Sequence, residues 1–299
     1  MHQPHRSFRK SASKRSGALL LAGMSLFGAT LISTAQAQTD YSTVEIIPHE
    51  VRGTVHYLQG AGGNIGLSIG EDGIIMIDDQ FAPLTDKILA AIRGLSDGEI
   101  RFLINTHMHG DHTGGNENLG RLGIVILARD EVRVRMATTQ PKIALPVLTY
   151  SEDITLHLNG EEVISISVPP AHTDGDSYIY FTESDVLHMG DVFRTTGYPF
   201  IDLANGGSLH GTISALGLAI GMSGPNTIII PGHGDVSTRE DVMAFRDMIL
   251  DVVDRVKPLV EGGMTFEQVT AAAPTARYDA QWGDPARFLQ SVYTELGRE

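Results

Sequence analysis

The sequence predicts one domain made of two mixed β-sheets that face each other, with helices on their outer sides. Three observations support this fold class. Strands followed by helices occur twice along the 299 residues. Four apolar strands each lead into a loop that carries a histidine or an aspartate. No repeat or interdomain linker divides the chain, and its length suits one large core.

The first half of this domain is predicted to begin with strands and to end with helices. Glycine-rich turns at 60–64 and 71–73 separate the first three strands, as hairpins require. The apolar residues of 84–92 have helical spacing. In chain order we expect strands 54–58, 65–69 and 74–78, helix 84–92, strand 101–105, short helix 116–122, strand 124–127 and a helix from about Arg129.

The second half repeats this order. Short polar turns separate four strands, and helices follow them. We expect strands 154–158, 162–168, 177–182 and 186–189, a helix from about Gly211, strand 227–230 and a helix from Arg239. Residues 257–299 are predicted to add a short helical tail, on which Trp282 packs.

The most informative segment is His107-Met108-His109-Gly110-Asp111-His112, directly after the apolar strand 101–105. Positions i and i+2 of an extended loop point the same way, so His107 and His109 can converge on one metal ion. We expect Gly110 to let the backbone turn, so that Asp111 and His112 face a second ion. Imidazole and carboxylate are ligands that zinc accepts readily.

Three later strands end in the same way. Loops that follow buried strands can hold such side chains on a rigid scaffold. The candidate ligands are His172 after strand 162–168, Asp191 after strand 186–189 and His233 after strand 227–230.

This pattern resembles the metallo-β-lactamase fold superfamily, over nearly all of the chain that follows residue 37. The family's H-x-H-x-D-H motif and its later ligands are matched by His107, His109, Asp111, His112, His172, Asp191 and His233. The resemblance implies a four-layer αββα sandwich with the metal site at one edge. It also implies two Zn²⁺ ions per chain, one held by His107, His109 and His172, the other by Asp111, His112 and His233. Asp191 would bridge the two ions or complete the second site.

The activity that this resemblance implies is hydrolysis of a small molecule. Two zinc ions that share a water lower its pKa to about 7. The resulting hydroxide attacks a carbonyl, and the carbonyl that the resemblance indicates first is that of a β-lactam. Asp111 would orient this nucleophile. Segment 171–176 is also similar to the β-lactamase branch. We find no G-x-S-x-G motif that would suggest a serine nucleophile instead.

Further polar residues have two readings each. Asp78 either braces a ligand-bearing loop or caps a strand end. Asn205 either faces the substrate, as an asparagine in a similar loop of the β-lactamase branch does, or is a turn residue. His210 lies near the site or at a helix start. Three other histidines, His56, His157 and His188, are expected in the core or on the surface.

Residues 1–37 have the pattern of a secretory signal peptide. Basic residues precede an apolar run from Gly17 to Ile32, and Ala35-Gln36-Ala37 matches a small-x-small cleavage site. The apolar run is short for a membrane span, although an uncleaved anchor is the alternative. We therefore expect a periplasmic domain of residues 38–299, with no stable membrane anchor after cleavage.

The charge and the cysteine content restrict the possible substrate classes further. Removing residues 1–37 takes away five basic residues and no acidic one, so the net charge falls from −14 to −19. Nucleic acid needs basic patches, so this charge argues against the nuclease branches and for a small-molecule substrate. The chain has no cysteine. In one large β-lactamase subclass a cysteine holds the second zinc, whereas Asp191 stands at that place here.

Several alternatives follow from these departures. The cysteine subclass often covers the drug with bulky residues in the hairpin that corresponds to the glycine-rich loop 60–64. Lactones, thioesters or phosphoesters are therefore the alternative substrates. The short tail disfavours glyoxalase-like thioesterases, and His109 disfavours oxygen-reducing diiron relatives, which carry a carboxylate there. A non-catalytic periplasmic metal-binding module is the alternative of another class.

Overall fold

The computed structural model describes residues 40–298, and the predicted signal peptide lies outside them. From Asp40 onward the chain forms one compact unit. Its first sheet contains β1 (Ile47–Arg52), β2 (Val55–Gln59), β3 (Ile65–Gly70), β4 (Gly73–Ile77), β5 (Ile100–Ile104), β6 (Val125–Arg129) and β7 (Leu148–Tyr150). The second contains β8 (Ile154–Leu158), β9 (Glu161–Ser167), β10 (Ser177–Phe181), β11 (Val186–His188) and β12 (Ile228–Ile230).

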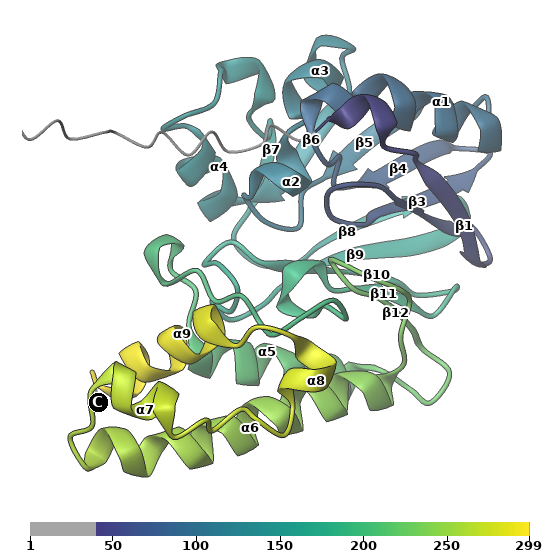
Figure 1. Cartoon of the computed structure of the whole chain (residues 1–299). Helices are drawn as coiled ribbons and strands as arrows, with labels where there is room; N and C mark the ends of the chain where they lie inside the picture. The colour runs from purple at the N-terminus through teal and green to yellow at the C-terminus, as the bar shows by residue number, and fades with distance from the viewer. Residues whose placement is uncertain (1–39, 299) are drawn as a thin grey trace, which may run out of the picture. The chain divides into compact units, whose positions relative to one another are not determined.

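Helices cover the outer side of each sheet (Figure 1). On the side of the first sheet these are α1 (Thr85–Leu95), α2 (Gly110–Thr113), α3 (Asn116–Arg121) and α4 (Asp130–Met136). On the side of the second sheet they are α5 (Leu209–Met222), α6 (Arg239–Glu261), α7 (Phe266–Ala271), α8 (Asp279–Trp282) and α9 (Ala286–Leu296). The predicted αββα sandwich is therefore confirmed.

Both sheets are mixed. In the first, the strands lie in chain order, antiparallel from β1 to β4 and parallel from β4 to β7. The second has the order β12-β11-β10-β9-β8, and only its β11–β12 pair is parallel. Strands β9, β11 and β12 consequently run in one direction, so the loops that follow them lie at one edge of the sheet.

Strand alternation explains why the sheets are buried on both faces. In β4, Ile75 and Ile77 belong to the core between the two sheets, whereas Ile74 and Met76 belong to the core beneath α1 and α3. A third core, which includes Phe245 of α6, fills the space between the second sheet and its helices. Three apolar layers thus separate the four structural layers.

The C-terminal segment belongs to this outer helical layer. Trp282 packs on Phe245, with ring centroids 5.1 Å apart, and Phe288 of α9 is buried in the same core. The helical segment begins later than the predicted residue 257, because α6 continues through Pro258 to Glu261. Pro258 lacks the N–H that would donate to the carbonyl of Asp254, so α6 continues past it with one backbone hydrogen bond fewer.

Two edge strands were missed by the sequence analysis. Strand β1 contains Pro48, which weakens a strand pattern and is tolerated at an edge. Strand β7 has three residues, too few for a periodic signal. Within residues 40–298, no helix has the length and apolar character needed to cross a membrane.

Candidate metal centre

The predicted ligands converge where the loops after β5, β9, β11 and β12 meet. The loop after β5 leaves the buried strand end at Ile104 and turns directly into α2, whose first residues are Gly110 and Asp111. Two groups of donor atoms form, with the atoms of each group within 4.8 Å of one another. We call them the first triad (His107, His109, His172) and the second triad (Asp111, His112, His233).

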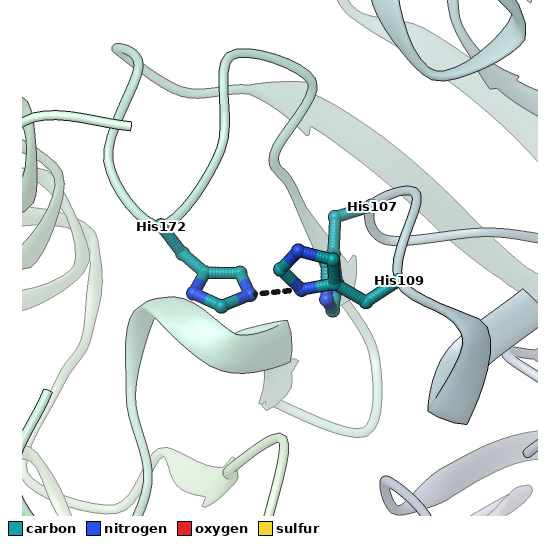
Figure 2. A group of neighbouring side chains, drawn as sticks. All are labelled: His107, His109 and His172. Carbon is teal, nitrogen blue, oxygen red and sulfur yellow. Dashed lines mark hydrogen bonds between the residues drawn. The ribbon is translucent and has the colours of Figure 1, made fainter. Parts of the chain in front are cut away.

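Figure 2 shows how the first triad closes. Nε2 of His172 lies 2.8 Å from Nδ1 of His109, and the rings of both pack edge-on against His107. Nε2 of His107 is buried and has no hydrogen-bond partner among the described residues. Three nitrogen atoms therefore face a shared space.

Hydrogen bonds on the far side of each ring decide which nitrogen carries the proton. His109 donates from Nε2 to Oδ2 of Asp202 (2.9 Å), and His172 donates from Nδ1 to the carbonyl of Phe200 (2.6 Å). In these tautomers, the two nitrogens that face each other each carry a lone pair. A metal ion bound between them would accept both lone pairs.

Asp78 holds both ends of the loop 106–112. Its Oδ1 accepts the backbone N–H of Thr106 (2.8 Å), and its Oδ2 accepts the Thr106 hydroxyl (2.7 Å). Because that hydroxyl donates to Asp78, it must accept from Nδ1 of His107, 3.0 Å away. Oδ2 of Asp78 also accepts from Nδ1 of His112 (2.7 Å). The bracing role considered for Asp78 is thus the arrangement that the structure contains.

Asp78 is close enough to His107 and His112 to form a third possible metal group. We do not assign it as a ligand, because its two oxygens already accept three hydrogen bonds. These bonds turn Nε2 of His107 and of His112 away from Asp78. Carboxylates that orient ligating histidines in this way are common around metal sites.

The donor atoms of the second triad and of Asp191 have the spacing of ligands around one metal ion. Oδ1 of Asp191 lies 3.1 Å from Nε2 of His112 and 3.2 Å from Nε2 of His233. Oδ2 of Asp111 lies 3.3 Å from Nε2 of His233. Ligands bound about 2.0–2.1 Å from a tetrahedral zinc ion lie roughly 3.3 Å from one another.

Asp191 stands between the two triads. Its Oδ1 faces the second triad, whereas its Oδ2 lies 3.8 Å from Nε2 of His172 in the first. The carboxylate is nearly buried, with 7% of its side chain exposed. This position is the one required of a carboxylate that serves both sites.

Burial favours the neutral form of two histidines in the first triad. It lowers the pKa of His107 well below the usual imidazole value, and it lowers that of His172 in the same direction. A histidine must be neutral to bind a metal ion. These rings therefore meet that requirement at neutral pH.

In the second triad the pKa of a histidine is shifted in the opposite direction. Burial opposes charge on His112, but the carboxylates of Asp191 and Asp78 outweigh it and raise its pKa well above the usual value. Burial likewise opposes ionisation of Asp111, but a hydrogen bond from His233 and the charge of His112 lower its pKa to about 2. The carboxylates around His112 thus favour a positive charge in the second triad.

The glycine-rich loop after β2 is packed against the second triad. A Cβ atom on Gly63 would lie 2.1 Å from Cε1 of His112, so only glycine fits. The backbone N–H of Gly63 donates to the carbonyl of Asp111 (3.0 Å), and the amide of Gln80 donates to the carbonyl of Gly63 (2.8 Å). This loop therefore supports the ligands directly.

The expected role of Gly110 is wrong. Gly110 is the first residue of α2, and its φ is not positive. A Cβ atom there would meet nothing within 4 Å. The unusual backbone lies instead after β4, where Asp78 and Gln80 have φ of 61° and 56°. Such conformations cost about 1–3 kcal/mol each and occur where other contacts enforce them.

The remaining sequence candidates lie as follows. Asn205 donates to Oδ2 of Asp202 (2.7 Å) and accepts from Arg135 (3.1 Å), so it supports the partner of His109. It also lines a cavity beside the site, so its contact with substrate stays a prediction. His210 is exposed in the first turn of α5. His188 is buried and interacts with the carbonyl of Asn64 and the N–H of Gly190, consistent with a structural role.

The sequence analysis did not find Thr106, Phe200 or Asp202. Thr106 directly precedes the motif and had the right type for a hydrogen-bonding partner. Phe200, whose ring stacks on His109 with centroids 5.9 Å apart, and Asp202 lie in a segment without periodic pattern. Only the folded chain brings Asp202 to a histidine 93 positions earlier.

Comparisons with known proteins agree with this fold. Residues 59–240 match the family model of the metallo-beta-lactamase superfamily. A curated relative, beta-lactamase-like protein 2 homolog of Caenorhabditis elegans, is 23% identical over 250 residues, which cover 82% of this chain and 78% of that protein. A metallo-beta-lactamase from Pontibacter korlensis has a TM-score of 0.62 at 16% identity and covers 69% of this chain and 100% of its own. The DIM-1 metallo-beta-lactamase has a TM-score of 0.61 at 17% identity, over 69% of this chain and 98% of its own. Because the family model spans well over half of the sequence, the chain belongs to the metallo-beta-lactamase superfamily.

Proposed function

We propose that this protein is a zinc-dependent hydrolase with two ions per chain, and that its first substrate class to test is the β-lactams. The observation that carries the proposal is the pair of triads with Asp191 between them. Four of the five histidines have their outer nitrogen in contact with a hydrogen-bonding partner, so that the inner nitrogen is directed at the shared space.

The first triad would hold one ion, the second triad the other, and Asp191 would contact both. When bound, the ions would supply Lewis acidity that activates a water and polarises the carbonyl to be attacked. The chain would supply the rest. Asp111, ionised and 31% exposed, would orient a water at the open side of the site by accepting its hydrogen bond at the carboxylate oxygen that does not face the second triad.

The open side is defined by three ligands that retain solvent contact. The side chains of Asp111, His109 and His233 are 31%, 19% and 18% exposed, whereas those of His107, His112 and His172 are buried. A substrate therefore approaches past the exposed members of both triads. Neither triad is sealed, as a purely structural zinc site would be.

β-Lactams come first because both structural neighbours named above are metallo-beta-lactamases, although at 16–17% identity they share the fold alone. Two features also allow other substrates. Asp191 stands in place of a thiolate, and the loop 60–64 packs on His112 rather than presenting bulky residues. Lactones, thioesters and phosphoesters are the second candidates.

The test is turnover of a chromogenic cephalosporin by the zinc-loaded protein. We expect ring opening that a chelator abolishes and zinc restores. Turnover unaffected by chelation would remove metal from the mechanism. A protein that holds two zinc ions but opens no cephalosporin would direct the search to a panel of lactones, thioesters and phosphoesters.

The alternative of a non-catalytic metal-binding module makes a different prediction. Such a module would bind zinc but hydrolyse none of these compounds. Measuring metal content and hydrolysis separately on the same preparation distinguishes the two.

We also propose that the protein is exported to the periplasm after removal of residues 1–37. The basic start, apolar run and Ala35-Gln36-Ala37 support this. Cell fractionation and the mass of the mature chain test it, since retention of the first 37 residues in a membrane fraction would indicate an uncleaved anchor.

A further inference from the structure

Hydrogen bonds on the outer side of His109 continue beyond Asp202. Oδ2 of Asp202 accepts from Nε2 of His109 (2.9 Å) and also from the side-chain amide of Asn205 (2.7 Å). Oδ1 of Asn205 accepts in turn from Nη1 of Arg135 (3.1 Å), which belongs to α4. A line of hydrogen bonds therefore connects a candidate ligand of the first triad to a cation on α4.

The chemistry of the groups in this line fixes the direction of each bond. The guanidinium of Arg135 donates and cannot accept, whereas the carboxylate of Asp202 accepts. The amide of Asn205 has one end of each kind, so it fits between them in one orientation, with Nδ2 toward Asp202. Arg135 thus determines where the amide of Asn205 points.

The two oxygens of Asp202 are held by different means. Oδ1 accepts from the backbone N–H groups of Ala204 and Asn205, each at 3.1 Å. Oδ2 accepts from the side chains of His109 and Asn205 instead. Because the side chains of Asp202 and His109 are 14% and 19% exposed, water can compete for Oδ2. The position of this oxygen therefore depends on the amide of Asn205.

Arg135 is itself fixed by Asp174. Its Nε and Nη2 donate to the two oxygens of Asp174 (2.7 and 2.5 Å), and such a bidentate pair sets the plane of the guanidinium. Both side chains are 27% exposed, so water and the opposite charge of Asp174 weaken the electric field of Arg135 at its neighbours. What Arg135 presents to Asn205 is therefore a fixed donor rather than an unbalanced charge.

The pair of Arg135 and Asp174 is not required to join the two loops that flank the first triad. The backbone N–H of Asp202 donates to the carbonyl of His172 (2.9 Å), and that of Asp174 donates to the carbonyl of Asn205 (3.1 Å). The backbone thus already connects these loops. The bond from Arg135 to the side chain of Asn205 adds control over an amide that the backbone leaves free to turn.

We propose that Arg135 is a positioning residue for the first triad. It holds the amide of Asn205 on Asp202, and Asp202 thereby keeps the ring of His109 directed at the first ion. The proposal rests on the proposed function, because it takes His109 to be a ligand of that ion. It adds a residue of α4 to those that determine the affinity of the first triad.

Arg135→Met tests the proposal, because methionine keeps much of the apolar length of the side chain and removes every donor. The affinity of the first ion is measured by competition with a chromogenic chelator, in the Asp111→Asn background that leaves the first triad intact. We expect binding to weaken about 3–10-fold, less than after loss of a direct partner, because Arg135 acts through two other side chains. Arg133→Met is the matched control, since Arg133 lies on the same helix and donates to the carbonyl of Pro146.

A double-mutant cycle identifies the route of the effect. Asn205→Ala is expected to weaken the first ion at least as much as Arg135→Met does, and the two changes together are expected to cost no more than Asn205→Ala alone. Asn205→Ala leaves α4 unchanged, so it tests the line of hydrogen bonds even if Arg135→Met folds poorly. Additive losses would show that Arg135 acts by another route, such as its pair with Asp174.

The Nε2 proton of His109 provides a readout that a general loss of stability does not change selectively. Its exchange with water is measured by NMR in the zinc-loaded protein after ¹⁵N labelling of the histidines. We expect exchange about tenfold faster in Arg135→Met and in Asn205→Ala, because Asp202 is no longer held as the acceptor. The Nδ1 proton of His172, which is donated to the carbonyl of Phe200, is the internal reference and is expected to be unchanged.

The outcomes separate this proposal from the proposed function. If Arg135→Met matches Arg133→Met in first-ion affinity and in exchange of the His109 proton, Arg135 is not a positioning residue and the metal centre stands. Additive losses in the cycle, or equal acceleration of exchange at His109 and His172, would also overturn the proposal. If the wild-type protein binds no zinc, the proposed function fails, and the role of Arg135 fails with it.

Discussion

The two triads hold their donor atoms by different means. In the first, every ring has a partner on its outer nitrogen, namely Thr106, Asp202 or the carbonyl of Phe200. In the second, His112 alone is fixed in this way, and carboxylates surround it. Among the described residues, no hydrogen bond fixes the outer nitrogen of His233.

The two triads therefore differ in what would determine their affinity for a metal ion. The first triad contains no carboxylate and its rings are pre-organised, so its affinity depends on ring orientation. The second triad contains the carboxylate of Asp111, faces that of Asp191 and is more exposed, so its affinity depends on attraction of a cation. We therefore expect the second ion to be lost and exchanged first. Four predictions test this, from the largest effect to the smallest.

The largest effect is expected from Asp78→Ala, because Asp78 braces both triads. His112 loses its partner directly, and His107 loses its own through Thr106. Since the Asp78–His112 pair is fully buried, its loss is expected to lower the free energy of unfolding by about 3–5 kcal/mol. The affinity for each ion is expected to fall about 10–100-fold. Chemical denaturation and metal analysis after dialysis measure the two effects.

Asp97→Ala is the control, since it removes an exposed carboxylate from the same half of the chain. Equal metal loss in both variants would show that Asp78 has no specific role. Loss of one ion alone from Asp78→Ala would show that the path through Thr106 does not reach the first triad.

Asp111→Asn confines the damage to the second triad. It removes the carboxylate that would orient the water, together with one negative charge, so hydrolysis is expected to fall at least about 10²-fold. The bound zinc is expected to drop from two ions to one, with the thermal unfolding temperature of the apoprotein little changed. Full retained activity would contradict the two-ion mechanism.

Asp202→Asn addresses the first triad alone. Asparagine still accepts a hydrogen bond from His109 but lacks the charge, so the affinity for the first ion is expected to fall about 10–100-fold. Competition with a chromogenic chelator, in the Asp111→Asn background where one ion remains, measures this value. Asp279→Asn is the control, because Asp279 accepts from Tyr198 (2.8 Å) but no metal ligand. An unchanged affinity would show that the first triad does not depend on this carboxylate.

The sequence was informative wherever the signal was local. The i, i+2 spacing of His107 and His109, and the apolar strands before His172, Asp191 and His233, sufficed to select the candidate ligands that the fold brings together. Strand alternation and helical spacing likewise placed most elements to within a few residues. These features depend on neighbours in the chain, which a single sequence displays.

What the sequence could not predict depends on distant contacts. Asp202 reaches His109 across 93 positions, and Gly63 is required because His112 packs on it from another loop. Neither relation leaves a local pattern. The same cause explains the mistaken importance of Gly110, which lies inside the motif but has open space around it.

A pair of glycine variants measures that difference, with the smallest expected effects. In Gly63→Ala the added methyl meets the His112 ring, which Asp78 prevents from turning away, so we expect a loss of about 1–3 kcal/mol in unfolding free energy. The second ion should also bind less tightly. Gly110→Ala fits without contact in a helical backbone and is expected to gain about 0.5 kcal/mol through the unfolded state. Urea unfolding with and without a chelator separates packing from metal binding. Equal destabilisation by both variants would mean that the metal loop itself, rather than the loop that packs on it, is the strained element.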